Sequence, residues 1–126
     1  PYITAAETAG VAPVMMVSTT TSPERLSKIL TVKSGFIYLV AALGVTGMRQ
    51  KTDPVAQKLL ADLKNRTDIP IAPGFGISER EQVREWTDAG ADAVIVGSAL
   101  VREIEDSLVK PDTLIPRITA FVQSLK

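Results

Sequence analysis

The chain has 126 residues, 45% of them hydrophobic and 22% charged, and its formal net charge is zero. This length and composition predict a single folded domain, residues 1–126, and exclude a disordered tail. Because the charges balance, the sequence shows no excess of basic residues that would favour binding to nucleic acid or to an anionic membrane. No apolar run approaches the ~20 residues of a membrane-spanning helix. With no cysteine and no histidine, thiolate catalysis and the commonest metal ligands are excluded, so we expect no metal or cofactor.

Four short apolar runs lie along the chain without a clean alternation of polar and apolar residues. They occupy residues 12–17, 36–40, 69–72 and 91–96. Runs of this kind are typical of strands that are covered on both faces, as in parallel sheets.

Helix-length segments follow these runs and begin with recognisable signals. Ser22-Pro23 and Asp53-Pro54 each place a capping side chain before a proline at the first helical position. Residues 78–81 (SERE) have the pattern of a capping box that starts a third helix.

Further helices are expected near both ends of the chain. Residues 99–108 predict a short helix, and Pro111 opens a last one with a continuous apolar stripe. Residues 4–10 are consistent with the end of a helix that precedes the first strand.

The resulting order repeats a strand and a helix four times, which predicts βαβ units around a parallel sheet. Two α/β architectures fit this order: a doubly wound sheet, and a (β/α)8 barrel of the TIM type, of which four units make about half. A half-barrel leaves two strand edges and an apolar inner face open, so it needs another half or a second copy of itself.

Glycine clusters follow the second, third and fourth strands, at residues 44–47 (GVTG), 74–78 (GFGIS) and 97–99 (GSA). Glycine lets a backbone approach a bulky anion, and the helix that opens at Ser98 adds unpaired N–H groups. Any one cluster would serve equally well as a tight turn. Two of them in the last two strand–helix loops match the place of the phosphate site in barrels, so we predict phosphate binding.

Four segments in this order resemble strands five to eight of the tryptophan synthase α subunit: residues 36–40 (FIYLV), 44–47, 73–78 (PGFGIS) and 89–99 (AGADAVIVGSA). The resemblance runs through essentially the whole chain. It implies a (β/α)8 barrel that cleaves indole-3-glycerol phosphate to indole and glyceraldehyde 3-phosphate in tryptophan biosynthesis, itself using no cofactor. In that family the indole passes to a PLP-dependent β subunit within an αββα complex.

The resemblance also implies roles for individual residues. Substrate-binding positions are matched by Gly47, Phe75, Gly76, Ile95, Gly97 and Ser98. Among these, Phe75 and Ile95 match apolar walls around the indole ring, and the others match groups that hold the phosphate. Supporting catalytic positions are matched by Tyr38, which projects from the sixth strand, and by Thr46, which helps to order a catalytic carboxylate. Residues 48–53 match a mobile loop.

Each aromatic or polar candidate also has a purely structural interpretation. Tyr38 and Phe75 would then be core aromatics, and Thr46 would cap its loop. Trp86 lies at helical spacing from Val83 and is expected to pack in the outer layer.

The family's two catalytic carboxylates, a Glu on the second strand and an Asp in the following loop, have no match in these 126 residues. Asp92 begins a strand, so it is expected at the opposite, stabilising end of a barrel. The sequence therefore predicts the phosphate half of a lyase site without its catalytic half, with impaired docking of a β subunit. A homodimeric half-barrel that binds phosphate without turnover, and part of another phosphate-binding barrel isomerase, are the alternatives. The cytoplasm, or a plastid, is the expected location.

Overall fold

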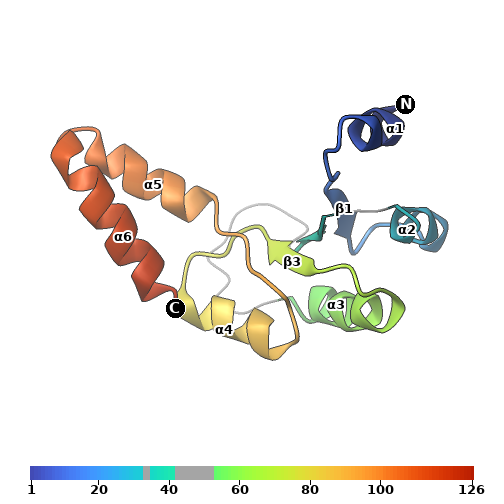
Figure 1. Ribbon diagram of the computed structural model, residues 1–126. Helices are drawn as coiled ribbons and strands as arrows, with labels where there is room; N and C mark the ends of the chain where they lie inside the picture. Colours follow the sequence, from blue (N-terminus) through green and yellow to red (C-terminus); the bar gives the residue numbers. More distant parts are fainter. Residues whose placement is uncertain (33–34, 42–52) are drawn as a thin grey trace.

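The structure, a computed structural model, describes residues 1–32, 35–41 and 53–126. In chain order its elements are α1 (Tyr2–Thr8), β1 (Met15–Ser18), α2 (Pro23–Leu30), β2 (Ile37–Val40), α3 (Pro54–Arg66), β3 (Ile71–Gly74), α4 (Arg80–Asp88), α5 (Ser98–Ser107), the 3-10 helix η1 (Pro111–Thr113) and α6 (Leu114–Ser124). Figure 1 shows α5 and α6 side by side, at the opposite side of the sheet from α1 and α2. Within the described ranges, no helix combines the length and the apolar character needed to cross a membrane.

The three strands form one parallel sheet in sequential order, β1-β2-β3. The register places Met16 beside Tyr38, and Val17 beside Leu39. Because successive residues of a strand point to opposite faces, these two pairs lie on opposite faces of the sheet. Val17 and Leu39 are fully buried, whereas Met16 is 58% exposed. The Val17 face is therefore packed, whereas the opposite face is exposed at Met16 and becomes buried toward Ala72 in β3.

The helices α2, α3 and α4 all contribute to the packed face. One continuous core joins the sheet residues to the helices: Val17, Ile37, Leu39 and Ile71 with Leu26, Ile29, Ala56, Leu60, Leu63 and Trp86. A doubly wound sheet carries helices on both faces and reverses its strand order, and the described residues show neither feature. The half-barrel architecture is confirmed, and Trp86 packs between helix and sheet as expected.

The predicted helix starts are confirmed, one of them with a shift. Ser22 Oγ accepts the N–H of Arg25 at 3.3 Å, and Asp53 Oδ1 accepts the N–H of Val55 at 2.9 Å. The capping box at the start of α4 is formed by Glu79 with Gln82, one residue later than the SERE pattern indicated. Gln82 Oε1 accepts the backbone N–H groups of Glu79 at 3.1 Å and of Ser78 at 2.9 Å, which closes the box at the later position.

The expected strand at residues 91–96 was wrong: the chain makes one isolated bridge there, at Ile95. The N–H of Asp92 donates to the carbonyl of Ile71, and the N–H of Ile95 donates to the carbonyl of Pro73. The two acceptors are two residues apart along β3, whereas the two donors are three residues apart, so the spacing of a regular ladder is lost. Pro73 has no N–H to donate, and the N–H of Ile71 donates to the carboxylate of Asp92 instead of to a backbone carbonyl. A regular ladder cannot form because β3 offers no free N–H group to this segment at Ile71 or at Pro73.

Asp92 lies at the start of β3, the edge opposite the glycine clusters. Its carboxylate accepts the N–H of Ile71 at 2.8 Å and pairs with Lys64 Nζ at 2.9 and 3.0 Å. The hydrogen bond from Lys64, which has the largest effect, and the hydrogen bond from the backbone of Ile71 lower the pKa of Asp92 below its ordinary 3.8. The predicted stabilising role at this end is consistent with these contacts.

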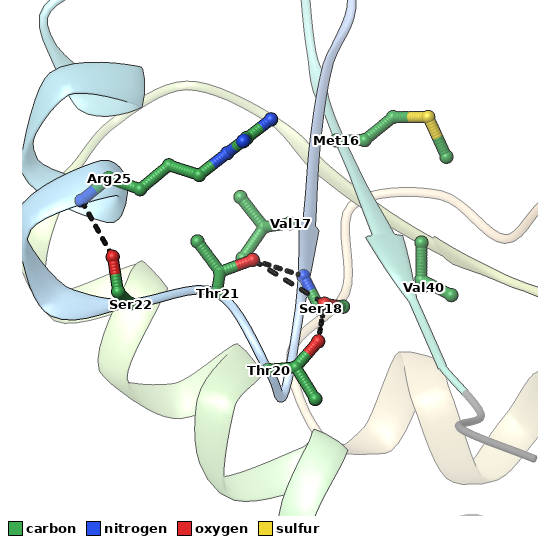
Figure 2. A pocket seen from close by; sticks show the side chains of 8 residues that line it. All are labelled: Met16, Val17, Ser18, Thr20, Thr21, Ser22, Arg25 and Val40. Carbon is green, nitrogen blue, oxygen red and sulfur yellow. Dashed lines mark hydrogen bonds between the residues drawn. The ribbon is translucent and has the colours of Figure 1, made fainter.

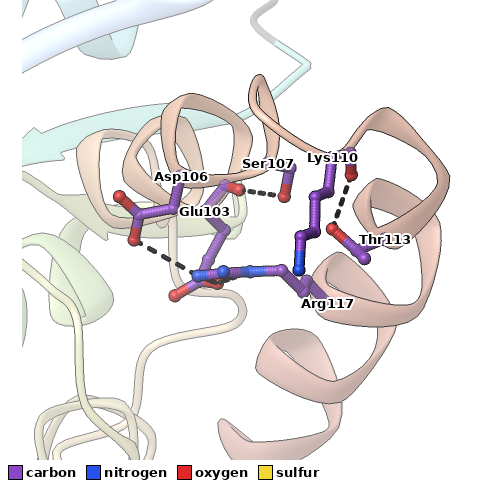
Figure 3. Close-up of polar contacts among 6 residues, drawn as sticks. All are labelled: Glu103, Asp106, Ser107, Lys110, Thr113 and Arg117. Atoms are coloured by element: carbon purple, nitrogen blue, oxygen red, sulfur yellow. Dashed lines mark hydrogen bonds and ion pairs between the residues drawn. The ribbon is translucent and has the colours of Figure 1, made fainter.

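The helices α5 and α6 are joined by a charged cluster rather than by a buried core. Arg117 on α6 donates to Glu103 at 3.0 and 3.2 Å and to Asp106 at 3.2 Å, both on α5 (Figure 3). The apolar stripe of α6 is only partly covered, and Ile115 remains 70% exposed. No residue of α6 is buried in the described chain.

Replacing Asp92 by Asn should destabilise the fold in a pH-dependent way. Because the folded pKa lies below the unfolded one, the stabilisation is complete above about pH 5 and is lost as the pH falls through the folded pKa. We expect a loss of about 1 kcal/mol at pH 7 that disappears once the pH has fallen below the folded pKa, since both partners are partly exposed.

Urea denaturation at pH 7 and at low pH measures this difference. The matched control is Asp62→Asn, which breaks a more exposed ion pair with Arg66 and should change stability by less than about 0.5 kcal/mol. Equal losses for the two variants, or a loss independent of pH, would contradict the assignment.

Candidate functional site

The carboxyl end of β3 is the junction at which three segments leave the sheet together. The carbonyl of Gly74 accepts the N–H of Ala41, the residue that follows β2, at 2.8 Å. On its other side Gly74 is bridged to Ile95, whose N–H donates to Pro73 at 2.8 Å. The segments after Ala41, Gly74 and Ile95 therefore start side by side at one edge of the sheet.

Tyr38 lies across this junction on the open face of the sheet. A methyl group on Gly74 would lie 2.5 Å from the Tyr38 hydroxyl oxygen and 3.0 Å from Ile95 Cβ. The side chain of Tyr38 thus reaches from β2 to the end of β3, next to Ile95. Tyr38 is only partly buried. Within these 126 residues its ring is therefore not fully enclosed.

The backbone turns sharply directly after Gly74. Phe75 has a φ of 97° and Gly76 a φ of 74°. For glycine this conformation is ordinary, but for phenylalanine it costs about 1–3 kcal/mol and is typical of functional sites. The Phe75 side chain is 59% exposed, so it is not a core plug.

The second backbone corner is Gly97, which caps α5 at its N-terminus. The first intrahelical bond runs from the N–H of Val101 to the carbonyl of Gly97 at 3.1 Å, so the preceding N–H groups of the first turn have no acceptor within the helix. Gly97 and Ser98 are exposed. The open N–H groups and the positive end of the helix dipole favour an anion here.

The structure therefore brings together most of the predicted site residues. Tyr38, Phe75, Gly76, Ile95, Gly97 and Ser98 lie on, or directly follow, the junction at Gly74. Thr46 and Gly47, and the expected loop at residues 48–52, lie outside the described residues. Two of the three predicted glycine corners are thus placed at one edge.

Nothing in the sequence indicated that Met16 shares the face of the sheet on which Tyr38 lies. Met16 pairs with Tyr38 in the register and is 58% exposed on that face. The run of residues 12–17 shows no alternation that would separate its two faces. Only the register across the sheet reveals which of its residues lie on the face of Tyr38.

Carboxylates near this edge are already engaged in helix caps. Asp53 Oδ1 caps α3, and Glu79 takes part in the capping box of α4. Asp92 lies at the opposite edge. Within the described ranges no group of three acidic, histidine or cysteine side chains could hold a metal ion.

A separate cavity of about 410 Å³ opens at the end of β1 (Figure 2). It is polar on one side, where Ser18 Oγ and Thr20 Oγ1 hydrogen bond at 2.9 Å and Thr21 Oγ1 accepts the N–H of Ser18 at 3.0 Å. Its remaining lining is Met16, Val17, Ser22, Arg25 and Val40. The glycine corners of β3 do not line it.

Known proteins match this chain along its whole length. A family model described as tryptophan synthase alpha chain matches residues 1–126. This chain belongs to the tryptophan synthase α chain family. It is 46% identical to the α chain of Acaryochloris marina, over 93% of this chain and 43% of that relative. It is 44% identical to the α chain of Methanoregula boonei, over 96% of this chain and 46% of that relative.

Solved structures of the tryptophan synthase family agree with the fold. The α2β2 tryptophan synthase complex from Pyrococcus furiosus matches with a TM-score of 0.85 at 33% identity, over 98% of this chain and 49% of that chain. An α subunit from the same organism matches with a TM-score of 0.83 at 31% identity. The resemblance in the sequence is confirmed, and the chain spans about half the length of the curated relatives it matches.

Replacing Gly74 by Ala should displace Tyr38 and destabilise the junction. The added methyl group would overlap the phenol ring, at 2.5 Å from its oxygen and 2.7 Å from Cζ. Overpacking of this kind costs about 1–3 kcal/mol. Urea denaturation and the NMR signals of the Tyr38 ring report the two effects.

The matched control is Gly97→Ala, because a methyl group there meets no atom within 4 Å and φ is −112°. It should lower stability by less than about 1 kcal/mol, because alanine is a poorer N-cap than glycine but creates no overlap. Unchanged Tyr38 signals in the Gly74→Ala variant would show that the ring does not lie on this glycine.

Proposed function

We propose that this chain supplies the phosphate-binding end of the active site of a tryptophan synthase α chain. The activity, a property of the longer protein, is the retro-aldol cleavage of indole-3-glycerol phosphate to indole and glyceraldehyde 3-phosphate in tryptophan biosynthesis. The observation that carries the proposal is the bridge between Gly74 and Ile95, which starts the Gly76 and Gly97 corners from neighbouring backbone positions. Family membership supports the choice of substrate.

In this proposal the phosphate is bound by backbone rather than by charged side chains. The amides near Gly76, Gly97 and Ser98 donate to phosphate oxygens, and the dipole of α5 adds a favourable potential. Gly47 contributes a third corner by analogy with the family. The open N–H groups at the start of α5 and the positive φ of Gly76 support these roles.

The indole end of the substrate lies against apolar side chains in this proposal. Phe75 and Ile95 flank the ring, and the neighbouring positions of Tyr38 and Ile95 over Gly74 support a common wall. Tyr38 assists at the reacting end, and Thr46 orders a catalytic carboxylate by analogy with the family.

The cleavage itself requires protonation of indole C3, deprotonation of its nitrogen and rupture of a carbon–carbon bond. In the family two carboxylates carry these proton transfers. Among the described carboxylates, Asp53 and Glu79 cap helices and Asp92 lies at the far edge. We therefore propose that the chain alone binds phosphate and does not turn over substrate.

Partners and location follow from the same proposal. The Pyrococcus furiosus relative forms an α2β2 complex, and we propose that the longer protein containing this chain docks a β subunit, whereas the 126 residues alone dock it poorly. The cytoplasm, or a plastid in a photosynthetic eukaryote, suits this role. The open edges of the sheet favour one alternative, a homodimer of half-barrels that binds phosphate without catalysis.

A charge placed at Gly97 tests the phosphate site. The position has open space and an ordinary φ, and both Asp and Asn are good caps, so Gly97→Asp and Gly97→Asn should fold equally well. We expect millimolar binding of glycerol 3-phosphate by the unaltered chain, because such a small ligand uses only part of the substrate's affinity. Gly97→Asp should weaken it by about tenfold or more through repulsion, and Gly97→Asn by much less.

Titrations followed by amide NMR measure these affinities and map the binding amides. Equal affinities for the Asp and Asn variants, or shifts confined to other parts of the chain, would refute the site.

Indole release tests the division of the active site. The isolated chain should give no measurable indole from indole-3-glycerol phosphate, because losing each general acid–base group costs about 10²–10⁴-fold. The longer protein should release indole. Turnover by the isolated chain near that of a full α chain would refute the division, and sugar phosphates bound in preference to indole derivatives would favour a barrel isomerase.

A further inference from the structure

The segment at residues 91–96 has one residue more than the stretch of β3 beside it. Its N–H groups place Asp92 opposite Ala72 and Ile95 opposite Gly74, because an N–H in a parallel ladder donates to the carbonyl of the residue before its partner. The extra residue lies between these two pairs, as in a β-bulge. Bulges of this kind re-aim the side chains that follow them.

This extra residue decides which side chain of the segment faces Tyr38. Ile95 shares the face of Tyr38, since its Cβ and the Tyr38 hydroxyl both lie against Gly74. The neighbouring apolar side chains pack against the helix-covered core instead: Ala91, Val94 and Val96. The first two of these are three residues apart, and only an extra residue lets both share one face. A slip by one residue would turn Val94 toward Tyr38 and displace the corner at Gly97.

Asp92 holds the amino end of the segment through two bonds to a single residue. Its N–H donates to the carbonyl of Ile71 at 3.0 Å, and its carboxylate accepts the N–H of Ile71 at 2.8 Å. Ile71 is fully buried, so without the carboxylate its N–H loses this acceptor away from water. Because an unpaired buried N–H is unfavourable, the segment would gain by sliding until one of its own carbonyls faces Ile71.

We propose that Asp92 is a positioning residue for the phosphate-binding corner at Gly97. By holding the segment opposite Ala72, its carboxylate confines the extra residue to positions 93–94, so that the corner starts beside Gly74. The inference rests on the proposed function, because phosphate binding is the property that this register controls. It assigns to the amino end of the segment a part in the site at the carboxyl end.

The two contacts of the Asp92 carboxylate have separable consequences. Asp92→Asn and Lys64→Met both remove the ion pair with Lys64 but keep a side-chain oxygen for the N–H of Ile71. Asp92→Ala removes the ion pair and that oxygen. All three variants lose stability, so a merely structural role predicts that all three weaken phosphate binding alike. A positioning role predicts that Asp92→Ala alone weakens it and that Asp92→Asn restores it.

Titration of the full-length protein with glycerol 3-phosphate, under conditions in which every variant is folded, measures this difference. We expect Asp92→Ala to weaken binding by about fivefold or more, because displaced donors no longer fit the phosphate. Asp92→Asn and Lys64→Met should stay within about twofold of the unaltered protein, because the bond to Ile71 remains. Equal affinities for Asp92→Ala and Lys64→Met would overturn the proposal.

Hydrogen exchange of the free protein tests the register without any ligand. The N–H of Ile95, which donates to Pro73 at 2.8 Å, should exchange about tenfold faster in Asp92→Ala than in Lys64→Met, relative to the buried amide of Leu39. Equal exchange in the two variants would overturn the proposal. Tight binding that Asp92→Ala leaves unchanged would refute the positioning role alone, whereas no binding near Gly97 in the unaltered protein would refute the proposed function and this role together.

Discussion

The bare backbone of Gly74 is the constraint on which the proposed site depends. Its carbonyl holds the end of β2 through Ala41, and its other side is bridged to Ile95. Because it has no side chain, Tyr38 can lie across it. A single residue without Cβ thus brings a phenol, an apolar wall and two backbone corners to one edge, without any ion pair among them.

The two edges of the sheet are built by different physical means. At the amino edge of β3, Asp92 joins Lys64 and the backbone of Ile71 through charge-assisted hydrogen bonds that stabilise the fold. At the carboxyl edge the backbone is strained at Phe75 and the start of α5 leaves its N–H groups open. The stabilising contacts and the proposed site thus lie at opposite ends of the strand, as is general for barrels.

The helices pack mainly against one face of the sheet. The helices bury the Val17 face into one continuous core, while the Met16 face and the edge of β1 stay open. The α5–α6 pair is held by Arg117 rather than by a core of its own. In a family whose members are about twice as long, these open surfaces are where the rest of a barrel would close.

Local structure could be predicted from the sequence, because it depends on neighbouring residues along the chain. The caps at Ser22 and Asp53, each followed by a proline, were predicted correctly, as were the three paired strands and the half-barrel order. Family membership followed from the glycine segments. Tertiary contacts decided the rest. Residues 91–96 have the composition of a strand. They form no regular ladder with β3, because Pro73 has no N–H and the carboxylate of Asp92 accepts the N–H of Ile71. The exposure of Phe75 and the face of the sheet on which Met16 lies depend on backbone φ and on register between strands, and neither is encoded by spacing along one strand.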